Sequence, residues 1–313
     1  MTDRLAGGSS ADIEVVSASL GSRRRDHEVW VTFRGRRCHI RRVGTDGDFE
    51  KLKSMYRQLD GKVDAIGMGG IDLHLVARGR RYAIRDAKRL VRQAPNTPIV
   101  DGSGLKDTLE RRAIQDTVAR GFDLAGKRVL MVSAVDRFGM AQALREVGAA
   151  ITFGDLIFGL GIPVPLRSWR SFDLLATLLL PVVTKLPFSL LYPTGTEQDK
   201  PPKPGRARYY EEADVIAGDF LYVRRYMPAD MTGKWVITNT TTAGDVDELR
   251  RRGVELLVTT TPVFEGRSFG TNVVEALLVA LDGRGRALES EEYVRALDEL
   301  GLSPAIQPLK EAA

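Results

Sequence analysis

The residues best suited to chemistry are acidic and basic side chains at turns that follow expected strands. Asp101 stands five residues before Lys106, which begins a predicted helix, and a lysine beside a carboxylate can move the proton of a hydroxyl group. Asp72 and Gly70 end the turn Gly67–Asp72, whose glycines allow the backbone to approach a ligand closely. We therefore expect Lys106 and Asp101 to be catalytic, and Asp72 and Gly70 to bind substrate.

Three more polar residues belong to the same hypothesis. Asn272 opens a late helix after Gly270-Thr271, and free N–H groups at a helix start suit an anion, so we expect Asn272 to bind substrate. Lys88 and His74 are alternative proton carriers. Each of these residues also fits an ordinary role, either as a surface lysine or as a half-buried packing residue.

A strand, a turn and a helix follow one another over residues 127–148, the arrangement that holds a pyrophosphate in dinucleotide-binding folds. Only Gly139 remains of the usual three glycines, with Ser133 and Asp136 at the other two positions. Asp155 ends the next strand, where a carboxylate binds the adenine ribose of NAD and repels the extra phosphate of NADP. We expect Ser133, Gly139 and Asp155 to bind NAD in preference to NADP, although Asp155 also suits a capping role.

Three later strands are also followed by small or hydroxylated residues. Gly218, Thr240 and Thr260 occupy these positions, and strand ends of a parallel sheet commonly meet a cofactor. We assign all three to cofactor binding. Strand propensity and helix capping would equally explain the threonines.

The segment Val100-Asp101-Gly102-Ser103-Gly104-Leu105-Lys106, followed by Leu109 and by Gly126-Lys-Arg-Val-Leu, resembles the shikimate/quinate dehydrogenase family. In that family an Asp-Gly-x-Gly segment begins the helix that leads to the NAD(P) domain. The resemblance covers mainly residues 98–155 and implies that Asp101 binds substrate hydroxyls. The Asn-Thr residues and the lysine motif of the family are absent, so the catalytic lysine has no matched position.

The order of expected elements indicates an α/β protein of two domains, the second a Rossmann-like, doubly wound parallel sheet. We place an N-terminal α/β substrate domain at residues 1–122 and the dinucleotide-binding domain at residues 123–281. An insertion at about 156–213 interrupts the second domain, and residues 282–313 form a C-terminal helix and tail.

The insertion contains an apolar run at residues 172–192. Pro181, Lys185 and Pro187 interrupt this run, so we expect no membrane-spanning helix. A helical hairpin packed on the core or a homodimer contact through residues 172–192 is favoured, with contact at a membrane surface as an alternative.

Composition narrows the class of protein. The chain has 313 residues, 43% of them hydrophobic, and a formal net charge of +5. One cysteine and three histidines argue against a disulfide framework or a metal site, and no leader is apparent, so we expect a cytoplasmic protein. Residues 1–92 hold 20 Lys and Arg against 12 Asp and Glu, which suits a small anionic substrate. No aromatic platform accompanies the arginines, so nucleic acid is not expected.

These features together predict an NAD(P)-dependent oxidoreductase acting on a cyclic hydroxy acid such as quinate or shikimate. Two alternatives stay open: a non-catalytic NAD(P)- or nucleotide-binding protein, and a phosphoryl-handling protein with a ribonuclease-H-like N-terminal domain. The broken glycine motif favours the first alternative, and the element order of the N-terminal half favours the second.

Overall fold

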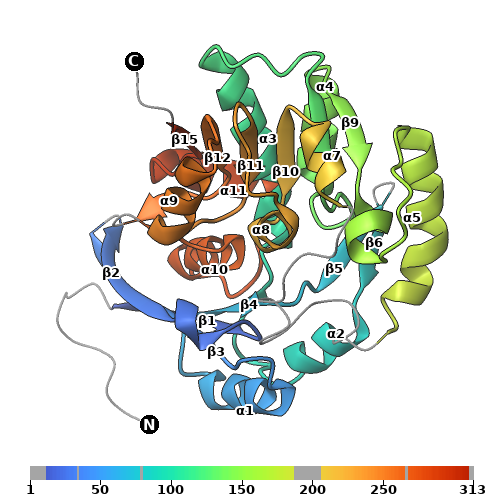
Figure 1. Ribbon diagram of the computed structural model, residues 1–313. Helices are drawn as coiled ribbons and strands as arrows, with labels where there is room; N and C mark the ends of the chain where they lie inside the picture. Colours follow the sequence, from blue (N-terminus) through green and yellow to red (C-terminus); the bar gives the residue numbers. More distant parts are fainter. Residues whose placement is uncertain (1–11, 34, 78–79, 187–205, 265–266, 310–313) are drawn as a thin grey trace, which may run out of the picture.

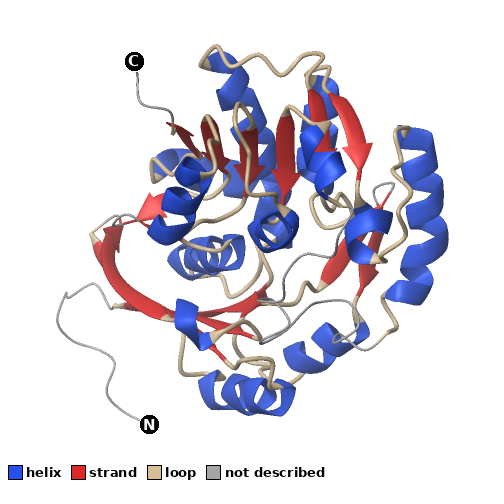
Figure 2. Ribbon diagram, viewed as in Figure 1, coloured by secondary structure: helices blue, strands red, loops and turns tan. Residues whose placement is uncertain are grey.

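The structure is a computed structural model that describes residues 12–33, 35–77, 80–186, 206–264 and 267–309. It is an α/β protein of two domains, each built around its own largely parallel sheet (Figure 1, Figure 2). The second sheet is Rossmann-like and doubly wound, as the order of elements predicts.

The first sheet has the strand order β2-β3-β1-β4-β7. Strands β1, β3, β4 and β7 run parallel, and β2 pairs antiparallel with β3. A small hairpin of two further strands and a short 3-10 helix, η1, accompany this sheet. The bounds are β1 (Ile13–Ser19), η1 (Arg23–Arg25), β2 (His27–Phe33), β3 (Arg36–Gly44), β4 (Ala65–Gly69), β5 (His74–Ala77), β6 (Arg80–Ala83) and β7 (Ile99–Val100).

Helices cover both faces of the first sheet. On one face lie α1 (Phe49–Leu59) and α2 (Arg85–Val91), whose buried leucines share a core with β1 and β4. Asp48 caps the start of α1, because its side chain accepts a hydrogen bond from Lys51 N at 2.9 Å. On the other face lies α10 (Thr271–Asp282), which is buried along nearly its whole length.

The second sheet has the strand order β15-β12-β11-β10-β8-β9, with only β15 antiparallel. Helices α3 and α4 cover one face, and α7, α8 and α9 cover the other (Figure 1). The strand bounds are β8 (Arg128–Met131), β9 (Ala150–Phe153), β10 (Val215–Gly218), β11 (Trp235–Thr238), β12 (Leu256–Thr259) and β15 (Ala305–Pro308). The helix bounds are α3 (Ser103–Ala119), α4 (Phe138–Glu146), α7 (Ala207–Glu211), α8 (Phe220–Tyr226) and α9 (Ala243–Arg251).

The remaining elements are peripheral to the two sheets. They are the π-helix η2 (Asp155–Gly159), α5 (Trp169–Val183), the short strands β13 (Val263–Phe264) and β14 (Arg267–Ser268), and α11 (Ser290–Glu299). Helix α5 runs along the outside of the molecule beside β5 (Figure 1). Among the described residues, no helix has both the length and the apolar character needed to cross a membrane.

Helices α3 and α10 connect the two domains. Leu105 and Leu109 of α3 pack in the core of the first sheet, whereas Ala113 and Ile114 pack in the core of the second. Helix α10 lies between β12 and β15 of the second sheet in the chain, but it packs against β1 and β4 of the first. The chain therefore passes between the two sheets more than once. The expected end of the second domain at residue 281 stays a prediction.

The C-terminal tail differs from the expectation. Residues 305–308 form β15, which pairs with β12 and extends the second sheet. Residues 169–183 of the expected insertion form the single helix α5, and residues 187–192 of its apolar run lie outside the described residues.

Candidate functional site

Two sequence-predicted residues meet between the sheets, with a partner that we did not assign. Asp72 follows β4, Lys106 lies in the first turns of α3, and Asp136 lies in the turn between β8 and α4. Lys106 Nζ is 2.5 Å from Asp72 Oδ1 and 2.9 Å from Asp136 Oδ1. Between 12% and 14% of each side chain is exposed. The lysine therefore neutralises two buried carboxyl groups that come from different domains.

Arg137 extends this group of charges into the second domain. Its Nη1 donates to Glu110 Oε1 at 2.9 Å and its Nη2 donates to Asp219 Oδ2 at 3.0 Å. Asn239 Nδ2 donates to the same Asp219 oxygen at 2.7 Å. Only 4% of the Arg137 side chain is exposed. We call the group the ion cluster, and its members are Asp72, Lys106, Glu110, Asp136, Arg137 and Asp219.

The carboxyl groups of the ion cluster differ in their affinity for protons. Burial and the nearby Asp136 charge raise the pKa of Asp72 to about 7. Burial alone would also raise the pKa of Asp136, but the Lys106 and Arg137 cations hold it below its ordinary value. Asp136 is thus the ionised member of the pair, and Asp72 is the member that takes up a proton near neutral pH.

Asp101 does not pair with Lys106 as we expected. Its Oδ2 accepts from Leu73 N at 2.5 Å and its Oδ1 accepts from Ser103 N at 3.0 Å. Asp101 therefore ties the turn after β4 to the start of α3, and Asp72 takes its place beside the lysine. The catalytic roles assigned to Lys106 and Asp101 stay predictions.

The turn expected to hold a pyrophosphate is already bonded to carboxylates of the chain itself. Asp155 Oδ1 accepts from Ala134 N at 2.9 Å and from Val135 N at 3.0 Å. Met140 N, in the first turn of α4, donates to Glu110 Oε2 at 3.0 Å. A phosphate would have to displace both acids, so this geometry does not favour NAD, and the cofactor stays a prediction.

Gly139 serves helix packing at this position. A Cβ there would lie 2.9 Å from Asp107 Cα of α3, which is too close for any larger residue. The glycine is thus explained by the close approach of α3 to α4, without a bound phosphate.

A cavity of about 130 Å³ lies between α5 and the carboxyl ends of β8 and β9. Apolar cavities of similar volume accept a molecule the size of benzene. Its polar lining is Ser133, Asp136, Asp155 and Tyr222. The rest of the lining is apolar apart from Gly159, and comprises Leu75, Val135, Leu156, Leu160, Leu166, Phe172, Leu175, Ala176, Leu179, Leu180 and Val183.

Asp155 is the distinctive polar group of this cavity. Its Oδ2 is buried and has no hydrogen-bond partner among the residues that the structure describes, although its Oδ1 accepts two backbone N–H groups. Burial raises the pKa of Asp155 to about 6, because the two N–H donors offset only part of the desolvation cost. Burial also raises the pKa of Tyr222, so the Tyr222 hydroxyl keeps its proton. One end of the cavity therefore offers an acceptor that lacks a donor.

The other sequence-predicted site residues contribute mainly to packing. Asn272 Nδ2 donates to Ser17 Oγ at 2.8 Å and joins α10 to β1. Gly70, at φ 75°, and Gly218, at φ 139°, occupy backbone conformations that favour glycine. Thr260 is buried and Thr240 is half-buried, and neither lines the cavity.

The two alternative proton carriers also lie apart from the cavity. Lys88 is exposed on α2, and His74 lies half-buried on β5.

The sequence analysis missed Glu110, Arg137, Asp219 and Tyr222. Glu110 follows Lys106 by four residues on α3, a spacing that places both side chains on one helix face. This spacing is the signal in the sequence that could have indicated a polar face on α3. No local pattern connects Arg137 with Asp219, because 82 residues separate them.

Comparison with known families assigns the chain. Residues 104–309 match the sequence model described as "Domain of unknown function (DUF8754)", and residues 14–101 match "Domain of unknown function (DUF8753)". Because the first match spans more than half of the chain, the protein belongs to the DUF8754 family, with a DUF8753 domain before it. No curated protein matches the sequence.

Several solved structures are similar over most of the chain at low identity. A galactofuranose binding protein has 10% identity and a TM-score of 0.37, over 92% of this chain and 98% of its own. A glucose-galactose binding protein from Geobacillus stearothermophilus has 10% identity and a TM-score of 0.38, over 97% and 99%. An NAD-dependent malic enzyme from Thermotoga maritima has 10% identity and a TM-score of 0.34, over 92% and 83%. Likeness at this level carries no argument about a ligand.

Two expectations from the sequence are therefore wrong. The chain is not assigned to the shikimate/quinate dehydrogenase family, because the family models that match it are DUF8753 and DUF8754. The expected NAD(P)-dependent oxidation of quinate or shikimate depended on that family assignment and is therefore wrong as well. An Asp-Gly-x-Gly segment at the start of α3 requires only a tight turn before the helix. Glycine suits such a turn in proteins of any family, so the segment does not by itself identify the shikimate/quinate dehydrogenases.

Proposed function

We propose that this protein binds a small amphiphile in the cavity beside α5, with an apolar body about the size of one ring and a polar end that donates a hydrogen bond. The observation that carries the proposal is the unpaired, buried Oδ2 of Asp155 at one end of a largely apolar cavity. A buried acceptor without a donor is costly, and a ligand hydroxyl or ammonium group would remove that cost.

The charge of the lining supports a neutral or cationic ligand. The described lining holds Asp136 and Asp155 and no lysine or arginine. The nearest cations, Lys106 and Arg137, already bind carboxylates of the ion cluster. An anionic substrate would meet the Asp155 carboxyl group, for which the described lining provides no cation, and this is unfavourable in a poorly solvated site.

The apolar wall sets the size and shape of the ligand body. Leu175, Leu179 and Val183 of α5 line the cavity together with Leu75 and Leu156 from other elements. Gly159 and Leu160, which also line the cavity, are exposed, so the cavity reaches the surface at this point. A ligand can enter here with its polar end directed toward Asp155.

A series of ring compounds with different end groups tests the proposal by calorimetric titration near pH 7. Benzyl alcohol and benzylamine should bind about tenfold more tightly than toluene, because a hydrogen bond to a charged acceptor contributes ~1.5–3 kcal/mol. Benzoate should bind most weakly of the four. The preference for a donor should disappear in Asp155→Asn, which keeps the side-chain shape and removes the charge.

Two results would contradict the proposal. One is benzoate as the tightest ligand of the series, which would mean that the cavity selects anions. The other is the absence of heat for all four compounds at concentrations where simple apolar cavities are filled.

A further inference from the structure

Helix α5 has a second apolar face that points away from the cavity. Leu174, Leu178 and Val182 lie one turn apart along this face, and they are 59%, 63% and 63% exposed. The opposite face of the same helix is buried through Phe172, Ala176 and Leu180. A helix that is apolar on both sides is normally covered on both sides, and the described part of this chain covers one.

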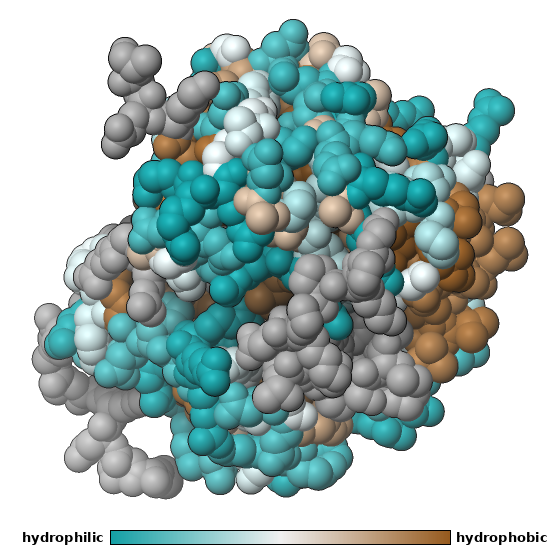
Figure 3. Space-filling view, in the orientation of Figure 1, coloured by the Kyte–Doolittle hydropathy of each residue, from teal (hydrophilic) through white to brown (hydrophobic). Residues whose placement is uncertain are grey.

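The exposed apolar surface extends beyond the helix. Leu160, Ile162 and Val164 precede α5 and are 48%, 46% and 48% exposed. Leu160 lines the same cavity as Leu175 and Leu179, so this loop borders the helix. We call the combined surface the outer apolar face, formed by Leu160, Ile162, Val164, Leu174, Leu178 and Val182. Figure 3 shows a hydrophobic surface gathered over α5.

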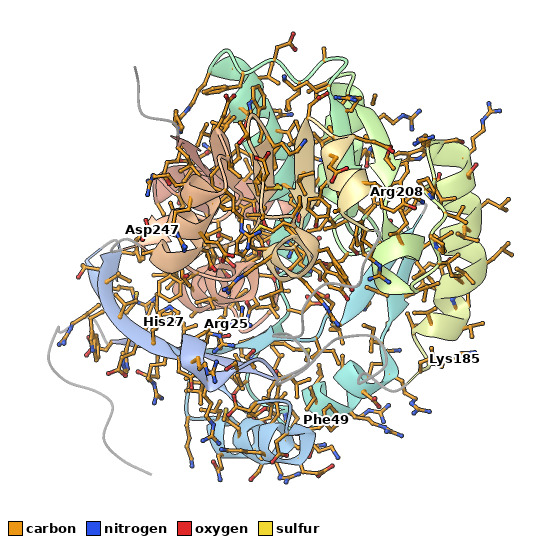
Figure 4. All side chains as sticks on the ribbon, in the orientation of Figure 1. Arg25, His27, Phe49, Lys185, Arg208 and Asp247 are labelled. Carbon is orange, nitrogen blue, oxygen red and sulfur yellow. The ribbon has the colours of Figure 1, made fainter. Side chains whose placement is uncertain are left out.

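Basic residues lie at both ends of the outer apolar face. Arg170 is exposed in the first turn of α5. Lys185, labelled in Figure 4, is exposed just after the last turn of the helix. Arg145 and Arg167 are also exposed near the start of the helix, where Arg145 stacks over the Trp169 ring and Arg167 pairs with Glu212 at 3.3 Å. Within α5 the one acidic residue, Asp173, is only half-buried and lies on neither end.

We propose that the outer apolar face docks on an anionic lipid surface, with α5 lying in the plane of the interface. An apolar helix face with cations at its margins matches the acyl and headgroup layers of such a surface. This inference rests on the exposed residues alone and does not require a ligand in the cavity.

The same charges argue against a second copy of the chain as the occupant. An antiparallel pairing of two α5 helices would set Arg170 of one copy beside Lys185 of the other. A parallel pairing would set each cation beside its own equivalent. Both arrangements place like charges together at both ends of an otherwise apolar contact, which is unfavourable.

Co-sedimentation with lipid vesicles tests this proposal on the full chain. We expect binding to vesicles of phosphatidylcholine mixed with phosphatidylglycerol, and weaker binding to phosphatidylcholine alone. The double variant Leu174→Asp/Leu178→Asp should lose at least about tenfold in partition coefficient, because two exposed apolar anchors become charged. Arg170→Gln/Lys185→Gln should reduce only the part of the binding that depends on phosphatidylglycerol, and salt at about 1 M should do the same.

Val294→Asp is the matched control, since Val294 is also an exposed apolar residue, 42% exposed on α11. It should bind vesicles as the unchanged protein does. Thermal unfolding checks that the double variant folds, and Leu174→Ser/Leu178→Ser replaces it if it does not. The proposal is overturned if the unchanged protein ignores the mixed vesicles, or if the double variant binds them equally well. It is also overturned if the unchanged protein is a dimer in sedimentation and the double variant is a monomer.

Discussion

The ion cluster and the α5 cavity lie next to each other and share Asp136. Buried charges are paired with opposite charges in the ion cluster, whereas the Asp155 carboxyl group of the cavity is not. In the ion cluster, Lys106 and Arg137 each bridge carboxyl groups from separate elements, and the structure gives their charges partners at 2.5–3.4 Å. In the cavity, Asp155 keeps one oxygen without a partner among apolar side chains. Arg137 Nε lacks a hydrogen-bond partner among the described residues, but each charge of the ion cluster has an opposite charge beside it, which holds the two domains in one arrangement. Asp155 has no such cation in the described lining, which leaves a position for a ligand.

This comparison also explains why the more conspicuous charges are not the proposed ligand site. The ion cluster holds four acids and two bases, and its charges are paired with one another. The cavity is mostly apolar, and a single unsatisfied oxygen distinguishes it.

The largest effect is expected from Arg137→Met. Removing the guanidinium leaves Glu110 and Asp219 buried without their cation, so the free energy of unfolding should fall by about 3–5 kcal/mol. Chemical denaturation near pH 7 measures this. The control Arg128→Met breaks a pair whose arginine is 63% exposed and should cost less than about 1 kcal/mol. Equal losses in both variants would mean that the ion cluster does not hold the domains together.

The next effect concerns the pH dependence of stability. The pKa of Asp72 is about 7, above the ordinary value of 3.8, so folding favours its protonated form. The contribution of the protonated Asp72 to the free energy of unfolding is fully present below about pH 4, and it is lost as the pH rises through about 7. Asp72→Asn stays neutral at every pH and should therefore be more stable than the unchanged protein by ~4 kcal/mol at about pH 8, with little difference at about pH 4.

Denaturation curves across this pH range check the prediction for Asp72. The control is Asp247→Asn, at a carboxylate that is 67% exposed (Figure 4). This variant should leave the pH dependence of stability unchanged. If Asp72→Asn is less stable than the unchanged protein at about pH 8, then Asp72 acts there as a needed anion and the assignment of protons in the ion cluster is incorrect.

A smaller effect is expected in ligand binding. Leu179→Trp places a larger side chain in the cavity wall and should weaken benzyl alcohol by about tenfold or more, because a cavity of 130 Å³ has little spare room. Leu174→Trp is the matched control, since Leu174 lies on the same helix, 59% exposed and outside the lining. Equal weakening by both variants would place the bound ligand elsewhere.

The smallest effect is the pH dependence of binding. Burial raises the pKa of Asp155 to about 6, so this carboxyl becomes fully ionised only above that value. An ionised carboxylate is the stronger acceptor, and the affinity for benzyl alcohol should rise several-fold between about pH 5 and about pH 7. Asp155→Asn should bind with the same affinity at both values. A pH-dependent affinity that persists in Asp155→Asn would assign the titration to another group, such as Asp72.

Much of the fold could be predicted from the sequence, because it depends on local patterns. Short apolar runs became β1, β4, β8 and β10, and Asp48 marked the start of α1. The tail strand β15 was missed because its four residues have no alternating pattern, and pairing with β12 is what extends them.

The site was harder to predict, and the reason is visible at Lys106. Its partners Asp72 and Asp136 lie 34 and 30 residues away, whereas the nearby Asp101 bonds to backbone groups. Sequence spacing favoured the near carboxylate, but the docking of the two sheets brings the distant ones to the lysine. Asp155 follows β9, as expected, but its carboxylate reaches the turn after β8 and occupies the N–H groups that a phosphate would need.

The sequence by itself determined the α/β class, the two-domain layout, the strands and the apolar character of α5, because these follow from the order and period of side chains along the chain. The tertiary structure decided which charges neutralise one another, which acid keeps an unpaired oxygen and which side of α5 encloses the cavity. Those outcomes depend on how α3 joins the two cores and on where α5 packs. Such contacts join residues far apart in the chain, and no local pattern encodes the distance between them.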